Sequence, residues 1–165
     1  NTVYRLYGAG DFDNDGNTDL VFRSTTTGVA SVMFLNGTGL RSSNSFGALP
    51  QVASQNWQIA GVDDFNGDGD PDLLWTNATT KQNSLWRMDG RAIDTDGFRG
   101  IRYPTAAGWR LVTTSDFDLD GDPDLLWANN STSANSVWLL GNVLAKPVAV
   151  SFTSLTLPVG VTVPA

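Results

Sequence analysis

Short runs of alternating apolar and polar residues follow one another along the whole chain. In Leu73-Leu74-Trp75-Thr76, for example, Leu73 and Trp75 fall on one face of a strand, and Leu74 and Thr76 fall on the other. The first fifty residues hold four such runs, which turn residues such as Gly, Asn, Asp and Pro separate. No helical period of useful length interrupts the runs, so the pattern predicts an all-β fold. The predicted strands of this first part are Tyr4–Ala9, Thr18–Ser24, Gly28–Leu35 and Ser43–Leu49.

The same arrangement of runs occurs three times. Each copy opens on an aromatic residue (Tyr4, Trp57 or Trp109), continues through an Asp-rich loop and then enters an apolar strand. The loops begin at residues 11, 64 and 116, which gives intervals of 53 and 52 residues, and all six Trp occupy equivalent positions. Tandem four-stranded units of this length are typical of β-propeller blades. The sequence therefore predicts three tandem four-stranded antiparallel blades in one repeat domain, residues 1–165, with units of approximately 1–53, 54–105 and 106–165.

Three blades are too few for a closed propeller, which has at least four. An open array would leave two apolar blade faces in water, and monomers rarely tolerate such patches. We therefore expect the ring to be completed by oligomerisation, as two chains in a six-bladed ring or as a head-to-tail polymer, or by further blades of a longer repeat protein. Residues Val148–Val163, rich in Val, Leu and Thr, are also a candidate for a strand exchanged between chains.

The negative charge of the chain is concentrated in the three loops. The net charge is −7, there is no Glu, and 14 of the 17 acidic residues lie in residues 11–19, 63–72 and 116–124. Clustered carboxylates repel one another and destabilise a fold unless a cation lies between them. The distribution of charge thus indicates cation sites and not a generally acidic surface.

Composition excludes several classes of function. The chain has no Cys and no His, so Ser-His-Asp and Cys-His catalysis and the usual zinc sites are absent. A pI near 4.2 and ten basic residues argue against nucleic acid as a partner. No apolar run is long enough to span a bilayer, so we expect no membrane insertion.

The loops share a nine-residue pattern, Asp-x-(Asp/Asn)-x-Asp-Gly-x-x-Asp. It offers side-chain oxygens at positions 1, 3, 5 and 9 and a backbone carbonyl at position 7, and calcium takes six to eight oxygen ligands. Gly at position 6 permits a sharp reversal at positive φ. We predict three Ca²⁺ sites, one per repeat. Their ligands are Asp11, Asp13, Asp15, Asp19 and the carbonyl of Asn17; Asp64, Asn66, Asp68, Asp72 and the carbonyl of Asp70; and Asp116, Asp118, Asp120, Asp124 and the carbonyl of Asp122.

The predicted sites differ from an EF-hand and from each other. Position 12, where an EF-hand has a bidentate Glu, is Phe22, Trp75 or Trp127, and a strand follows the loop. A single loop of this composition is also typical of a metal-free turn, but three copies in register favour the metal. The second site has one carboxylate fewer, so we predict weaker binding there. Phe at position 2 and Leu after position 9 should hold each loop against the blade interior, which favours a structural and not a catalytic ion.

The stretches Gly10–Phe22, Asp64–Trp75 and Asp116–Trp127 resemble the FG-GAP/VCBS repeat family. The resemblance covers three units and most of the chain. It implies propeller blades, as in integrin α-subunit heads and certain fungal lectins, with calcium in the loop between the first two strands of a blade. It also implies an extracellular, adhesive protein. The chain departs from the family in blade number and in the Gly-Ala-Pro element, of which Gly47-Ala48-Leu49-Pro50 is only an echo.

These observations predict a secreted or cell-surface module, stabilised by calcium, that serves in binding, adhesion or self-assembly and has no catalytic activity. Its expected partners are further copies of itself and, beyond these, a glycan or a cell-surface protein. Calcium can supply the cross-linking that disulfides give other small secreted domains, so the lack of Cys does not oppose this prediction.

Two alternatives stay open at this point. A propeller-type lectin would stack its Trp side chains on sugars, although their apolar neighbours favour core packing; the six are Trp57, Trp75, Trp86, Trp109, Trp127 and Trp138. A glycosidase would use two of Asp89, Asp94 and Asp96, the acids outside the loops, although a solvated turn explains them more simply. The triplets that begin at Asn36, Asn77, Asn129 and Asn130 fit the pattern for N-glycosylation.

Overall fold

The computed structural model describes residues 3–52, 54–101, 104, 106–141 and 151–155. The described residues form strands and turns, and none is in a helix, which confirms the all-β prediction. The chain divides into two compact units, Asn1–Thr105 and Ala106–Ala165. The division falls where the sequence places the start of the third repeat, whereas a single repeat domain over the whole chain stays a prediction.

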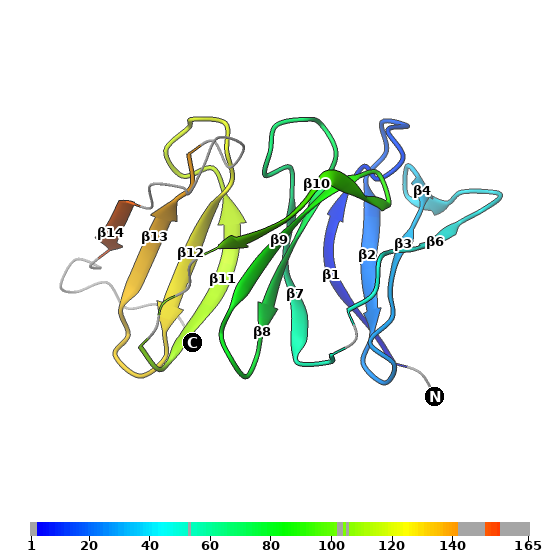
Figure 1. The fold of residues 1–165 in the computed structure, drawn as a ribbon. Coiled ribbons are helices and arrows are strands. Elements are labelled where there is room, and N and C mark those ends of the chain that lie inside the picture. The colour runs from blue at the N-terminus through cyan, green and yellow to red at the C-terminus, as the bar shows by residue number, and fades with distance from the viewer. Residues whose placement is uncertain (1–2, 53, 102–103, 105, 142–150, 156–165) are drawn as a thin grey trace. The chain divides into compact units, whose positions relative to one another are not determined.

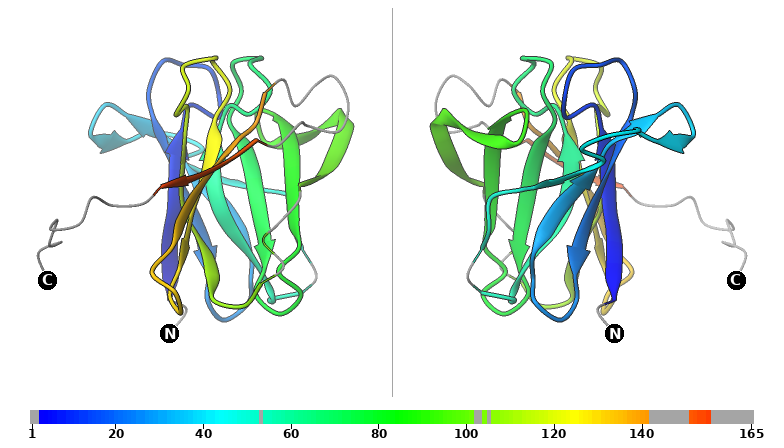
Figure 2. Two further views of the ribbon diagram at one scale, coloured as in Figure 1. Left: turned by 90° about the vertical axis from the view of Figure 1, so that its left-hand side faces the viewer. Right: turned by 90° about the vertical axis from the view of Figure 1, so that its right-hand side faces the viewer.

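The first repeat forms an antiparallel sheet of four strands (Figure 1), in the order β1 (Tyr4–Gly10), β2 (Asp19–Ser24), β3 (Ala30–Met33) and β6 (Phe46–Ala48). All four predicted strands are present, but the last two are shorter than predicted. The last residue of the predicted third strand, Leu35, belongs instead to a two-stranded hairpin that the pattern did not indicate, formed by β4 (Leu35–Asn36) and β5 (Gly39–Leu40). This hairpin projects from the edge of the sheet (Figure 2).

The second and third repeats form sheets of the same order, each an antiparallel meander. The second contains β7 (Trp57–Asp63), β8 (Asp72–Asn77), β9 (Asn83–Asp89) and β10 (Ala92–Ile101). The third contains β11 (Trp109–Ser115), β12 (Asp124–Asn129), β13 (Asn135–Leu139) and β14 (Ser151–Leu155). Strand β14 pairs with β13 of its own sheet. Exchange of residues 148–163 between chains stays a prediction, and the rest of that segment lies outside the described residues.

Irregular features of the backbone repeat as faithfully as the strands do. The pairing of first and second strands shifts register at equivalent points, between Leu6 and Gly8, between Ile59 and Gly61, and between Leu111 and Thr113. Such bulges increase the local twist of a strand pair. The turn after the second strand is closed in each copy by one side chain that accepts two backbone N–H groups; the three side chains are Ser24, Asn77 and Asn129.

The first two sheets share one hydrophobic core within the first compact unit. Val21, Val32 and Phe34 of the first repeat pack in the same cluster as Ile59 and other apolar residues of the second. The strands β1 and β7 approach closely because position 8 is Gly: a Cβ there would lie 2.5 Å from Val62 Cγ2.

A buried Arg also links these two sheets. Arg23 Nη1 donates to the carbonyl oxygen of Trp57 at 2.6 Å, and its Nε donates to that of Gly28 at 2.9 Å. The guanidinium carbon of Arg23 lies 5.4 Å from the centre of the Trp75 ring. The first two repeats are therefore joined by polar as well as apolar contacts.

Candidate metal sites in the repeat loops

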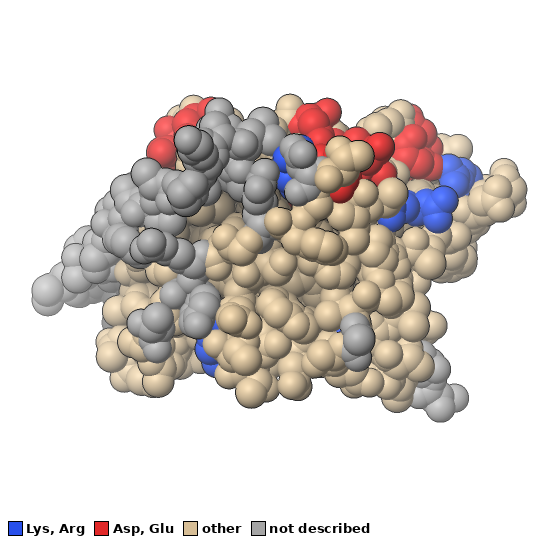
Figure 3. Space-filling view, in the orientation of Figure 1, with Lys and Arg blue, Asp and Glu red and all other residues tan. Residues whose placement is uncertain are grey.

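The three Asp-rich loops connect the first and second strands of their sheets. Within each compact unit their carboxylates gather at one end of the strands (Figure 3). The expected anchoring by Phe at position 2 holds for Phe12, which packs in the shared core and is 1% exposed. It is wrong for Phe117, which is 43% exposed. The second unit contains a single sheet, so it offers no shared core of the kind that covers Phe12.

Position 1 of every loop closes the turn by accepting backbone N–H groups. Asp11 accepts from Asp15 at 3.1 Å and from Gly16 at 2.8 Å. Asp64 and Asp116 make the equivalent bond to the Gly at position 6, at 2.8 and 3.0 Å. That Gly has φ of 85°, 97° and 98° in the three loops, a left-handed conformation that side chains disfavour. The prediction for position 6 is therefore confirmed.

Position 5 accepts the backbone N–H of position 7 in each loop, in the pairs Asp15–Asn17, Asp68–Asp70 and Asp120–Asp122. Hydrogen bonds from the side chain and the backbone of Asn17 lower the pKa of Asp15. In the second loop, Asn66 Nδ2 donates to Asp68 Oδ2 at 2.7 Å, while Asn66 Oδ1 accepts the N–H of Asp68 at 3.0 Å. The side-chain amide of Asn66 thus donates a hydrogen bond to one carboxylate oxygen of the second loop.

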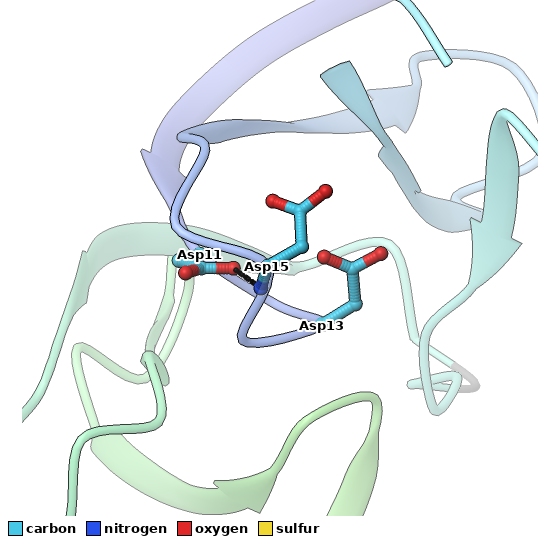
Figure 4. A group of neighbouring side chains, drawn as sticks. All are labelled: Asp11, Asp13 and Asp15. Atoms are coloured by element: carbon cyan, nitrogen blue, oxygen red, sulfur yellow. Dashed lines mark hydrogen bonds between the residues drawn. The ribbon is translucent and has the colours of Figure 1, made fainter. Parts of the chain in front are cut away.

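Positions 1, 3 and 5 converge in the first and third loops. One carboxylate oxygen from each of Asp11, Asp13 and Asp15 lies within 4.8 Å of the others, and Asp116, Asp118 and Asp120 form the same group. Figure 4 shows the first group, whose dashed line marks the bond from Asp15 N–H to Asp11. Desolvation and the neighbouring Asp120 carboxylate raise the pKa of Asp118.

The donor set of these groups fits a hard cation. All the side-chain donors are carboxylate oxygens, which are the ligands that calcium prefers. In the first group, moreover, Asp13 Oδ1 is buried and has no hydrogen-bond partner among the described residues. A buried oxygen without a partner is costly, and coordination of a cation would remove that cost.

Position 9 has a role that the sequence did not indicate. Asp19, Asp72 and Asp124 are fully buried, and they are not members of the groups just described. In each, Oδ2 accepts the N–H of position 2, seven residues earlier, and Oδ1 accepts the N–H of a residue 16 positions later. We call this arrangement the position-9 clamp. The later residues, which follow or lie in the third strand, are Leu35, Met88 and Leu140.

The clamp ties the start of each loop to the third strand of its sheet. Burial raises the pKa of Asp72 to about 7, and it also raises the pKa of Asp19. Each oxygen of these carboxylates accepts one N–H and has a further lone pair, so the predicted ligand role is compatible with the clamp.

Position 7 connects the loops with their surroundings. The side chain of Asn17 accepts the N–H of Gly37 at 2.9 Å, which joins the first loop to the β4–β5 hairpin. Asn14 Nδ2 donates to Asp70 Oδ1 at 2.9 Å, so the first and second loops are in direct contact.

The sequence did not indicate a contact at position 3 of the first loop. Arg41 forms an ion pair with Asp13, 28 residues away. No local sequence pattern indicates such a pair.

The residues singled out for the alternative functions have structural partners. Trp75 and Trp86 are buried against each other with ring centres 4.9 Å apart, and Trp127 and Trp138 are equally buried at 5.5 Å. Trp57 and Trp109 are partly buried. Asp94 Oδ2 lies 2.8 Å from Arg87 Nη2. Asp89 is exposed, and the side chain of Asp96 lies outside the description.

The four glycosylation triplets also differ in their structural setting. Asn77 and Asn129 are buried and close turns, whereas Asn36 and Asn130 are exposed. No helix of the described residues has the length and hydropathy needed to cross a membrane.

Comparison with known proteins agrees with the internal repeats. The sequence pattern of the FG-GAP-like repeat family matches the chain twice, over residues 11–75 and 64–127. No curated protein and no solved structure matches the chain significantly. The two family matches together span all three Asp-rich loops and most of the chain. The chain therefore belongs to the FG-GAP-like repeat family.

Proposed function

We propose that this chain is an extracellular repeat module, stabilised by calcium, that acts in binding, adhesion or self-assembly and not in catalysis. FG-GAP-like repeats generally serve in non-catalytic binding and adhesion and are typical of extracellular proteins. The observation that carries the calcium part of the proposal is the convergence of carboxylates at positions 1, 3 and 5 of the first and third loops.

Each loop residue would contribute to the stability of its sheet in a definite way. Position 1 orders the turn through its bonds to the backbone, and position 9 ties the loop to the third strand. When bound, calcium supplies positive charge that offsets the mutual repulsion of the carboxylates and cross-links the loop. The side chains that would hold it are those at positions 1, 3, 5 and 9, namely Asp11, Asp13, Asp15, Asp19, Asp64, Asn66, Asp68, Asp72, Asp116, Asp118, Asp120 and Asp124, with carbonyls at Asn17, Asp70 and Asp122.

The assembly part of the proposal rests on one apolar face of the first sheet. We call it the open face; it consists of Leu6, Leu20, Phe22, Met33 and Leu35. The equivalent residues of the second sheet, one repeat later, are all buried in the core that the two sheets share; they are Ile59, Leu73, Trp75, Trp86 and Met88. The face of a further blade that corresponds to the one carrying Val21 and Val32 would cover the open face in the same manner. We therefore propose a second copy of the chain as its partner, in a propeller ring or in a head-to-tail array.

The lectin and glycosidase alternatives have less support. Four of the six Trp are at most 9% exposed, so their rings are not free to stack on a sugar. Asp94 is paired with Arg87, which leaves it poorly suited to donate a proton as the general acid. A glycan or a cell-surface protein as partner is part of the proposal, but no described residue specifies which.

The proposal is tested by thermal unfolding of the full chain in calcium and after chelation with EDTA, with magnesium as the control ion. A site that binds only the folded state stabilises it by about 2.7 kcal/mol when the ion is at a hundred times Kd. We expect unfolding at a clearly lower temperature in EDTA. An unchanged unfolding temperature would overturn the calcium part.

Light scattering at several protein concentrations tests the assembly part. A monodisperse dimer supports a closed ring, and particles that grow with concentration support an array. A monomer at every concentration, with and without calcium, would overturn self-assembly.

A further inference from the structure

Arg41 lies between the β4–β5 hairpin and β6. Its Nη1 forms an ion pair with Asp13 Oδ2, and Asp13 is position 3 of the first loop. Its Nε donates to the carbonyl oxygen of Ser43 at 3.2 Å, and its Nη2 donates to that of Asn44 at 3.1 Å. All three nitrogens of the guanidinium are therefore engaged.

The guanidinium is also held by an aromatic ring. Its central carbon lies 4.4 Å from the centre of the Phe34 ring, and Phe34 is buried in the core of the first unit. A cation over an aromatic face is attracted by the ring. An exposed Arg on a flexible stem has no such set of contacts, so Arg41 is fixed beside the first loop before any ion arrives.

The other two loops use position 3 differently. In the second loop position 3 is Asn66, whose own amide donates to Asp68. In the third loop Asp118 accepts the backbone N–H of Asp120 at 3.3 Å. Two ion pairs are formed among the described residues, Arg41–Asp13 and Arg87–Asp94. Within this part of the chain, an Arg therefore contacts a predicted ligand carboxylate only in the first loop.

We propose that Arg41 is a built-in cation that competes with calcium for Asp13 and lowers the calcium affinity of the first loop. This inference rests on the proposed calcium binding. The guanidinium offsets one of the four ligand carboxylates, so the ligand side chains of the first loop then carry the same net charge as those of the second, which has three ligand carboxylates. Affinity in such loops follows ligand charge. The third loop is therefore the tightest of the three, and removal of Arg41 strengthens the first.

The three loops can be followed separately in the full chain by NMR. The amide N–H of the Gly at position 6 donates to position 1 in each loop, so the signals of Gly16, Gly69 and Gly121 report on calcium in their own loops. In the unaltered protein we expect Gly121 to shift at a lower calcium concentration than Gly16. A Gly16 midpoint at or below that of Gly121 would overturn the inference without any variant.

Substitution of Arg41 is the second part of the experiment. We expect Arg41→Gln to lower the calcium midpoint of Gly16 by about fivefold, because a partly exposed ion pair contributes up to roughly 1 kcal/mol. The midpoints of Gly69 and Gly121 should not change. Arg41→Lys keeps the charge and should leave the Gly16 midpoint near that of the unaltered protein.

The chain offers a matched control in Arg91, whose guanidinium carbon also lies over the Phe34 ring, at 5.7 Å. Arg91→Gln should leave all three midpoints unchanged. A Gly16 midpoint that is the same in Arg41→Gln as in the unaltered protein would overturn the role of Arg41. If no Gly signal responds to calcium in the unaltered protein, the proposed calcium function fails instead, so the two failures are distinguishable.

Discussion

The first and second sheets present the same apolar pattern, yet only one of them buries it. Ile59 of β7 is 4% exposed, whereas its equivalent in β1, Leu6, is 53% exposed. The other four members of the open face are partly buried, and their counterparts in the second sheet all lie in the shared core. The strand order and the bulge between the first two strands are the same in both sheets. The difference shows that each repeat has an apolar face that is buried only when a preceding repeat packs against it.

The largest effect is expected when one apolar side chain of each face is truncated to Ala. Ile59→Ala should lower the free energy of unfolding by about 3 kcal/mol, because it removes core contacts and leaves a cavity. Leu6→Ala should cost less than about 1 kcal/mol, since most of that side chain is in water. Urea unfolding at low protein concentration measures both. Equal losses would contradict the comparison and would indicate that Leu6 is covered in solution.

A smaller loss is expected from the polar link between the two sheets. Arg23→Met should destabilise the protein by about 2 kcal/mol, because the carbonyl oxygens of Trp57 and Gly28 lose their donor. Arg5→Met, on the exposed part of β1, is the matched control and should change stability by less than about 0.5 kcal/mol. If the two variants unfold at the same urea concentration, Arg23 does not join the sheets.

The close approach of β1 and β7 gives the third prediction. Gly8→Ala should cost about 1–3 kcal/mol, because its Cβ would overlap Val62. Combining it with Val62→Gly, which removes both overlapping atoms, should recover part of that loss. Gly100→Ala, where a Cβ would meet nothing within 4 Å, is the control. A Gly8→Ala protein as stable as the control would show that the two strands separate easily.

The smallest effect on unfolding is expected from a charge on the open face. Leu6→Asp should change the free energy of unfolding by less than about 1 kcal/mol, as Leu6→Ala does, yet it should abolish self-association, because a carboxylate is costly to bury. Arg5→Asp places the same side chain on the other face of β1 and should leave association intact. Light scattering distinguishes the two variants. Association that survives Leu6→Asp would place the interface elsewhere.

Much of the repeat architecture was predictable from local pattern. Alternation and turn residues located the four strands of each sheet, because strand faces and tight turns depend on neighbouring residues in the chain. The hairpin at Leu35–Asn36 and Gly39–Leu40 was missed, since two-residue strands are too short to show an alternation. The loops were located by the fixed spacing of Asp and Gly, and the left-handed Gly at position 6 followed from that spacing.

Other features depend on residues far apart in sequence. The pattern assigned Asp19, Asp72 and Asp124 to the metal alone, whereas each also joins its loop to a residue 16 positions later. It did not indicate that Arg41 pairs with Asp13, because side chains 28 residues apart meet only after the sheet has formed. It also could not tell Phe12 from Phe117, whose local sequences are alike.

The order of residues was therefore enough to specify three four-stranded units, their Asp-rich corners and their apolar faces, because each of these depends on contacts between near neighbours. The tertiary structure decided which faces are covered, which carboxylate meets a guanidinium and which Phe is buried. Burial and charge pairing depend on what lies across the space between strands, and that is set by packing and not by sequence spacing.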